Sequence, residues 1–158
     1  RGVDPASPVI SARFSIVALL LLGCAAKAQS DARILDAIGQ VEGGERLQRG
    51  DGGAALGLYQ MHASAWADGN AQLNREGRPT FHRWQWRSPL AQDMVALAYL
   101  RALRGRLTDR GIPNPSPECL ALCWNLGFTG AASIGFRLSN APPTRASYAV
   151  RVGNLVRR

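Results

Sequence analysis

The sequence predicts a mainly α fold, in which one compact helical domain carries a small loop or hairpin region. Apolar residues recur at helical spacing in several stretches of the chain. Two of these stretches open with a Ser-Pro pair, at Ser88-Pro89 and Ser116-Pro117, where serine caps a helix and proline fits its first turn. At 158 residues, the chain has the length of one domain and can bury a core without help from metals or disulfides.

Residues 1–28 are predicted to be an N-terminal extension and a secretory signal peptide. Residues 29–158 are then predicted to form the single folded domain of the exported protein. Residues 14–24 form an apolar run behind Arg13 that is too short for a stable membrane anchor. The run leads into Ala26-Lys27-Ala28, whose small residues are typical of a cleavage site. The alternative interpretation of the run is a buried core helix.

The segment Leu21-Leu22-Gly23-Cys24 resembles a lipobox, so an outer-membrane lipoprotein attached through Cys24 is the minor alternative. A membrane partner is expected only if Cys24 is lipidated. Under either signal, the domain is expected to work in the periplasm or as a secreted protein. The chain's net charge of +8 suits an anionic cell wall, anionic lipid or nucleic acid. No basic cluster is arranged as a nucleic-acid motif, so nucleic acid is not an expected partner.

The first helix of the domain is predicted to start with Ser30 or Asp31 as its cap and to stop at Gly43-Gly44. Its apolar residues share one side of the helix: Ile34, Leu35, Ile38 and Val41. Glu42 falls on the same side, so its carboxyl group is predicted to face the core. Desolvation raises the pKa of such a group and keeps it protonated near neutral pH, which a general acid requires. The alternative is a helix-terminal Glu that turns out to water past the two glycines.

The next part of the chain is predicted to be irregular around one short helix. Residues 46–55 are polar and rich in glycine, so they are expected to form a loop or a small hairpin. Residues 63–73 are predicted to form a short helix that carries Trp66. Residues 74–87 are the least regular and contain the run T-F-H-R-W-Q-W-R. The aromatic side chains of this run either stack on sugar faces or cover the core.

Three longer helices are predicted in the second half of the domain. The helix that opens at Ser88-Pro89 runs toward Gly111 and is apolar around most of its surface, as expected of a central helix. The helix that opens at Ser116-Pro117 is predicted to end at Gly127. A closing helix carries one apolar stripe: Tyr148, Val152, Leu155 and Val156.

Cys119 and Cys123 would share one face of a helix, and their expected role is core packing. A disulfide between them would be strained within a single helix, although an oxidising compartment permits it. A zinc site would need two more ligands, and His62 and His82 lie at no recognisable ligand spacing. No metal and no other cofactor is therefore expected.

Glu42 is followed 18 positions later by Gln60 of the segment Gly57-Leu58-Tyr59-Gln60. This arrangement resembles the catalytic core of the soluble lytic transglycosylases, which are relatives of the goose-type lysozymes. In that family, E-S is followed by a variable loop and then by G-L-M-Q. The present chain departs from the pattern twice, because Gly43 replaces the serine and Tyr59 replaces the methionine.

Two later segments resemble the same family. Trp124-Asn125-Leu126-Gly127 is similar to the family's A-Y-N-A-G segment, with Trp124 in place of the tyrosine. Tyr148 precedes an R-V pair, as in the family's last segment, where a tyrosine points into the cleft. The resemblance covers roughly residues 30–158 and implies a lysozyme-like α+β fold, with the hairpin region beside the active-site cleft.

The resemblance implies a peptidoglycan lytic transglycosylase that cleaves the β-1,4 bond between N-acetylmuramic acid and N-acetylglucosamine. Glu42 would protonate the bond and then accept the proton of the muramic acid 6-hydroxyl, which closes a 1,6-anhydro ring without water. Gln60 and Asn125 would hydrogen-bond to the sugar, and Gly57 would let the backbone approach it. The substrate-binding residues that the resemblance implies are Gly57, Leu58, Tyr59, Gln60, Trp124, Asn125 and Tyr148. Tyr59 and Trp124 could equally be ordinary core residues.

Two alternatives remain open at this point. A goose-type lysozyme would hydrolyse the same bond and would need a second carboxylate, for which Asp51 and Glu45 are the candidates. A wall-binding or assembly protein would keep the lysozyme-like fold without catalysis. The expected partner is the peptidoglycan glycan strand, and one hypothesis for the role is local wall opening for a secretion or conjugation apparatus.

Overall fold

The computed structural model describes residues 30–158, and residues Asp31–Arg158 form one compact unit. These residues are mainly helical and include a single small sheet of two strands, so the predicted mainly α fold is confirmed. The predicted signal peptide, its cleavage after Ala28 and the lipidation of Cys24 lie outside the described residues.

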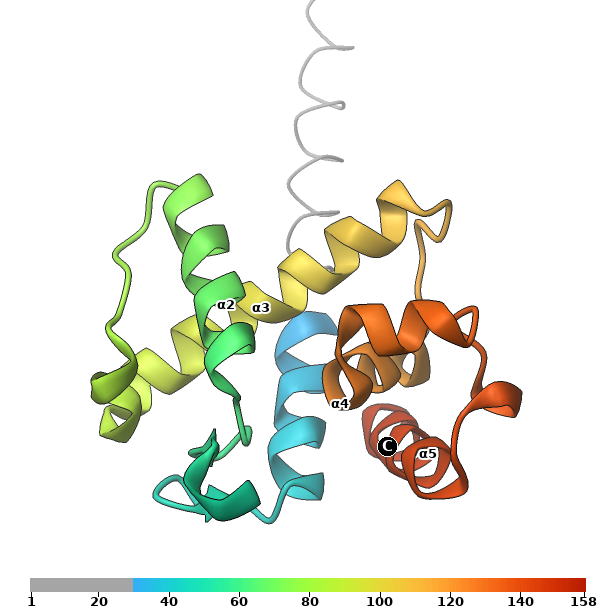
Figure 1. Ribbon diagram of the computed structural model, residues 1–158, viewed down its shortest axis with the longest axis horizontal. Coiled ribbons are helices and arrows are strands. Elements are labelled where there is room, and N and C mark those ends of the chain that lie inside the picture. Colours follow the sequence, from blue (N-terminus) through green and yellow to red (C-terminus); the bar gives the residue numbers. More distant parts are fainter. Residues whose placement is uncertain (1–29) are drawn as a thin grey trace, which may run out of the picture. The chain divides into compact units, whose positions relative to one another are not determined.

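The first helix is described over residues 30–41 and occupies the middle of the unit in Figure 1. Its predicted apolar side is buried, since Ile34 and Ile38 are almost fully excluded from water. The helix stops at Gly43 and Gly44, where φ is 115° and 77°, values that glycine adopts without strain. Asp31 lies in this helix, and its buried carboxylate pairs with Arg104. The predicted cap of the helix start falls at the edge of the described residues and stays a prediction.

A short hairpin follows the first helix, as one of the two alternatives for residues 46–55 predicts. Strand β1 (Arg49–Gly50) pairs antiparallel with β2 (Ala55–Leu56), and the 3-10 turn η1 (Asp51–Gly53) joins them. Arg49 lies opposite Leu56 in this register. The hairpin therefore presents its turn on one side of the end of the first helix (Figure 1).

Helix α2 (Ala63–Arg75) packs along the long helix α3 (Pro89–Asp109). Gly69 allows this close approach, because a Cβ atom there would lie 2.5 Å from the Val95 carbonyl oxygen. The Oγ of Ser88 accepts a hydrogen bond from the Ala91 amide, so the predicted start of α3 is confirmed. Ten of the 21 residues of α3 are buried, and they include residues fully excluded from water, as expected of a central helix: Val95, Ala96, Leu100, Leu103 and Leu107.

The aromatic run before α3 divides its tryptophans between the core and the surface. It ends in the 3-10 helix η2 (Arg83–Arg87). Trp86 is only 6% exposed, whereas Trp84 is 74% exposed and stacks on His82. Trp86 therefore covers the core, and Trp84 lies on the surface beside His82.

Helices α4 (Pro117–Ser133) and α5 (Pro143–Val156) pack against each other, with the short 3-10 helix η3 (Leu138–Asn140) between them in the chain. The predicted end of the fourth helix at Gly127 coincides with a kink in α4 that separates two helical segments. Gly127 breaks the helix with φ 72° and ψ 158°, but the chain then resumes helical geometry up to Ser133. The second part is held because Ala131 is fully buried.

Cys119 is half-buried and Cys123 fully buried, and both are free thiols on α4. They belong to the core or pack against it, as predicted. Within residues 30–158, no helix combines the length and the apolar character needed to cross a membrane.

Candidate active site

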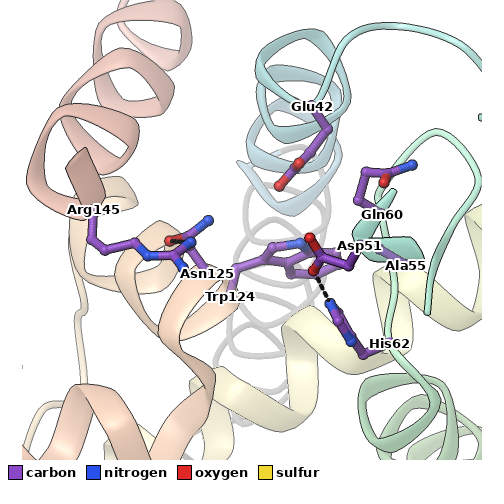
Figure 2. A pocket seen from close by; sticks show the side chains of 8 residues that line it. All are labelled: Glu42, Asp51, Ala55, Gln60, His62, Trp124, Asn125 and Arg145. Atoms are coloured by element: carbon purple, nitrogen blue, oxygen red, sulfur yellow. Dashed lines mark hydrogen bonds and ion pairs between the residues drawn. The ribbon is translucent and has the colours of Figure 1, made fainter. Parts of the chain in front are cut away.

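A cavity of about 390 Å³ lies where the first helix ends. Figure 2 shows its lining side chains arriving from two sides, the hairpin and the following turn on one side and helices α4 and α5 on the other. The lining residues are Glu42, Asp51, Ala55, Gln60, His62, Trp124, Asn125 and Arg145. A second cavity of about 250 Å³ shares Gln60, His62, Trp124 and Asn125 with the first, so the two cavities are adjacent, and together they are called the groove below.

Glu42 follows directly on the first helix, and its amide still donates to the Ile38 carbonyl at 2.9 Å, which continues the helical turn. Its side chain is half-buried and points into the cavity (Figure 2). The hydroxyl of Tyr148 donates a hydrogen bond of 2.6 Å to Oε1 of Glu42. The carboxyl group is therefore held in one orientation at the cavity wall.

Burial raises the pKa of Glu42 above its ordinary value, because the charged form loses water. The Tyr148 hydrogen bond and the positive charge of Arg145 act in the opposite direction, and the negative charge of Asp51 adds to the rise. Burial and the neighbouring Glu42 charge also raise the pKa of Tyr148, so its hydroxyl stays a donor at neutral pH. The result is a carboxyl group that holds its proton more readily than an exposed Glu.

Trp124, Asn125 and Arg145 form the side of the cavity opposite the hairpin. Arg145 Nη1 donates to Asn125 Oδ1 at 2.8 Å, which ties α5 to α4 beside the groove. Trp124 Nε1 donates to the Tyr59 carbonyl at 3.3 Å, and its ring packs against Tyr99 at a centroid distance of 5.1 Å. Trp124 thus packs against the core and also forms part of the cavity wall.

Asp51 and His62 form a pair on the hairpin side of the cavity. His62 Nε2 lies 2.9 Å from Asp51 Oδ2, and both side chains are at least half exposed. Asp51 has a φ of 48°, in the left-handed region that few non-glycine residues adopt. The geometry places a second carboxylate on the wall of the same cavity as Glu42.

Gln60 lines the cavity, but its amide group is largely occupied by the turn that carries it. Its Nε2 donates to the Gly57 carbonyl at 2.8 Å, and its backbone has a φ of 46°. The Oε1 atom fills the space where a side chain at Gly50 would lie. Gln60 therefore braces the turn against the hairpin and presents the rest of its side chain to the groove.

Three of the candidate residues build the turn beneath the cavity and are not among its lining residues. A Cβ atom at Gly57 would lie 2.7 Å from the Gln92 side chain, so the absence of a side chain at Gly57 makes room for Gln92. Gln92 Oε1 accepts from the Leu58 amide at 2.9 Å. Tyr59 is 6% exposed, and its hydroxyl donates to Asp93 at 2.8 Å. These contacts give the turn residues a structural role in the described chain.

Glu45, the other candidate for a second carboxylate, is exposed and lines neither cavity. Of the two candidates, only Asp51 is brought to the same cavity as Glu42.

His62 and Arg145 were not among the residues selected from the sequence as site residues, and both line the cavity. Arg145 lies three residues before Tyr148 on α5, and this spacing places both side chains on one helix face. His62 lies two residues after Gln60, immediately before α2. The spacing of Arg145 and Tyr148 could have been used to find Arg145 from the sequence. The position of His62, in contrast, depends on how the turn folds back over the hairpin.

Among residues 30–158, no group of three or more His, Cys, Asp or Glu side chains is arranged to hold a metal ion. Comparison of the chain with models of protein families, with curated proteins and with solved structures gives no match.

Proposed function

We propose that the protein is a peptidoglycan lytic transglycosylase in which Glu42 acts first as general acid and then as general base. The observation that carries this proposal is the Glu42 carboxyl group itself. It lies on the wall of a cavity, its pKa is raised by burial, and Tyr148 holds its orientation. A pKa moved toward neutrality suits a group that must give and then take the same proton.

In the proposed reaction, protonated Glu42 donates its proton to the oxygen that links N-acetylmuramic acid to N-acetylglucosamine. The bond from that oxygen to C1 of the muramic acid breaks, and positive charge develops on the sugar ring. The Glu42 carboxylate then accepts the proton of the muramic acid 6-hydroxyl as that oxygen bonds to C1. The products are a 1,6-anhydro sugar and a free 4-hydroxyl on N-acetylglucosamine, and Glu42 is protonated again.

The rest of the groove supports a sugar ligand of this kind. Its lining is polar, with the side chains of Asn125, Arg145 and His62 available to hydroxyl and amide groups. The indole ring of Trp124 forms part of the wall in both cavities and supplies an apolar surface for a sugar ring. No part of the proposed reaction requires a metal or a cofactor.

The test is digestion of purified peptidoglycan by the wild-type chain and by Glu42→Gln, with the fragments weighed by mass spectrometry. We expect fragments with anhydro ends from the wild type. The glutamine variant cannot transfer a proton, and we expect its rate to fall by about 100-fold or more. Reducing ends would identify a hydrolase, and an absence of fragments would favour a non-catalytic wall-binding protein.

A lysozyme-like hydrolase is the second candidate, because Asp51 lies on the same cavity as Glu42 and is paired with His62. In that mechanism Asp51 would activate a water molecule, and Asp51→Asn would abolish most of the activity. In the transglycosylase mechanism no water is activated. We then expect Asp51→Asn to keep activity within a few-fold and to lower the pKa of Glu42, because a like charge is removed.

We further propose that the protein acts on glycan strands outside the cytoplasm, in the periplasm or as a secreted enzyme. Local opening of the wall for a secretion or conjugation apparatus is the role that suits a small catalytic domain. Deletion of the gene followed by measurement of secretion or conjugation, and separately of wall turnover, would distinguish this role from general wall recycling.

A further inference from the structure

Arg145 is the arginine that lines the larger cavity, and no carboxylate of residues 30–158 forms an ion pair with it. Its guanidinium lines the cavity and is oriented by one hydrogen bond, from Nη1 to Asn125 Oδ1 at 2.8 Å. The remaining N–H groups are free to bind a ligand. A planar guanidinium held in this way matches the two oxygens of a carboxylate.

The charges of the cavity are separated across its width. Figure 2 shows Arg145 and Asn125 on one side and Asp51 with His62 on the other, with Glu42 reaching in between them. An anionic substituent near Glu42 would be repelled by Asp51 and attracted by Arg145. The arrangement therefore selects both the charge of a ligand and the direction in which it lies.

The α5 helix adds to this preference. Arg145 lies in the first turn of α5, which contains no acidic residue. The amino-terminal end of a helix carries partial positive charge, which adds to the positive charge of the Arg145 guanidinium. The positive side of the groove therefore consists of the Arg145 side chain and the amino-terminal end of α5, and both favour an anionic ligand.

We propose that Arg145 binds the lactyl carboxylate of N-acetylmuramic acid and thereby directs the site to glycan strands that have lost their stem peptides. This inference rests on the proposed function, because it assumes that the muramic acid lies beside Glu42. The lactyl group is attached to the same sugar ring as the bond that is cleaved. It ends in a free carboxylate only where the peptide has been removed, since the peptide is joined to it as an amide. The first free carboxylate of a stem peptide lies farther along the chain.

The test compares three substrates: glycan strands freed of peptide by an amidase, the same strands with the lactyl carboxylates converted to methylamides, and strands with intact peptides. We expect kcat/KM of the wild-type chain to be about tenfold or more higher for the peptide-free carboxylate strands, as a charge-assisted hydrogen bond provides. Arg145→Gln should lose this preference, and Arg145→Lys should retain part of it. Arg137→Gln removes the same charge from an exposed residue that lines neither cavity, and it should behave as wild type.

Binding of the same three substrates to Glu42→Gln, measured by titration calorimetry, separates recognition from catalysis. Equal affinity for carboxylate and methylamide strands would overturn the inference. Equal or tighter binding of peptide-bearing strands would also overturn it, since the guanidinium would then take a peptide carboxylate or none. If binding prefers the carboxylate through Arg145 but the wild type releases no anhydro ends, the proposed function fails and the recognition stands. If anhydro ends form at the same rate from methylamide strands, the function stands and this inference fails.

Discussion

The hydroxyl of Tyr148 donates a hydrogen bond of 2.6 Å to Oε1 of Glu42, across 106 positions of the sequence. This bond joins the end of the first helix to α5 and favours the charged carboxylate. Burial of the same carboxylate favours the protonated form and is the stronger influence, so the pKa of Glu42 is raised. The pKa of Glu42 therefore depends on two opposing influences, and a substitution that removes one of them shifts this pKa in a defined direction.

Tyr148→Phe removes the donor and keeps the ring. Because the hydrogen bond lowers the pKa of Glu42, its loss is expected to raise that pKa further. The alkaline limb of the pH–rate profile for peptidoglycan digestion reports loss of the Glu42 proton, and it should shift to higher pH. Tyr59→Phe removes a hydrogen bond to Asp93 and should leave that limb in place. An unchanged limb in Tyr148→Phe would show that this bond does not tune Glu42.

Glu42→Gln is expected to change how the free energy of unfolding depends on pH. The pKa of Glu42 is raised in the folded chain, so the folded state binds the proton more tightly than the unfolded state. The unfolding free energy therefore decreases as pH rises from the ordinary Glu pKa through the raised value. We expect Glu42→Gln to be more stable relative to wild type at about pH 7 than at about pH 3. Urea denaturation at the two pH values measures this, and an equal difference at both would contradict it.

Gly57→Ala is expected to destabilise the turn more than Gly52→Ala. Both glycines have positive φ, but a Cβ at Gly57 meets Gln92 at 2.7 Å, whereas a Cβ at Gly52 meets nothing. The Gln92 amide cannot move aside without losing its hydrogen bonds to Arg46, Leu58 and Trp86. We expect a loss of unfolding free energy of about 1–2 kcal/mol from the backbone in both variants, with about 1–3 kcal/mol more from the clash in Gly57→Ala.

Thermal and urea unfolding of the two glycine variants provide the measurement. The Gly52→Ala value serves as the reference for backbone strain alone. Equal losses in the two variants would mean that Gln92 rearranges at no cost. The tight contact between Gly57 and Gln92 would then not contribute to the free energy of unfolding.

Arg104→Ala is expected to lower the unfolding free energy by about 3 kcal/mol, because it leaves a buried carboxylate without its partner. Asp31 is 4% exposed, and its ion pair with Arg104 ties the first helix to α3. Arg137→Ala changes the same charge at an exposed position and should cost little. Urea denaturation of both variants tests the difference, and a loss below about 0.5 kcal/mol in Arg104→Ala would refute it.

Helix starts and the hairpin could be predicted because their signals are local. The Oγ of Ser88 accepts from the Ala91 amide, and that of Ser116 from the Cys119 amide, so each cap involves residues only three positions apart. The break at Gly127 was predicted in the same way, but the second helical segment of α4, up to Ser133, was not. Gly127 breaks the helix locally, but burial of Ala131 in the core restores it, and burial is a property of the assembled fold.

The candidate site was predictable in part. Glu42, Trp124 and Asn125 were selected from the sequence and line the cavity. Tyr59 was selected as a wall of the site, but its hydroxyl binds Asp93 and its ring is buried. Arg145 was missed, although its place three residues before Tyr148 puts both side chains on one face of the closing helix.

The sequence by itself determined that the chain is mainly helical and that a carboxyl group lies on the core-facing side at the end of the first helix. Both properties depend on residues within one or two turns of each other. Only the tertiary structure decided that Tyr148 would bind Glu42, that Arg145 would face Asp51 across the groove, and that Gln92 would fill the space beside Gly57. The physical reason is that these contacts join residues from different helices, and the packing of the helices, unlike their formation, is set by the whole buried core.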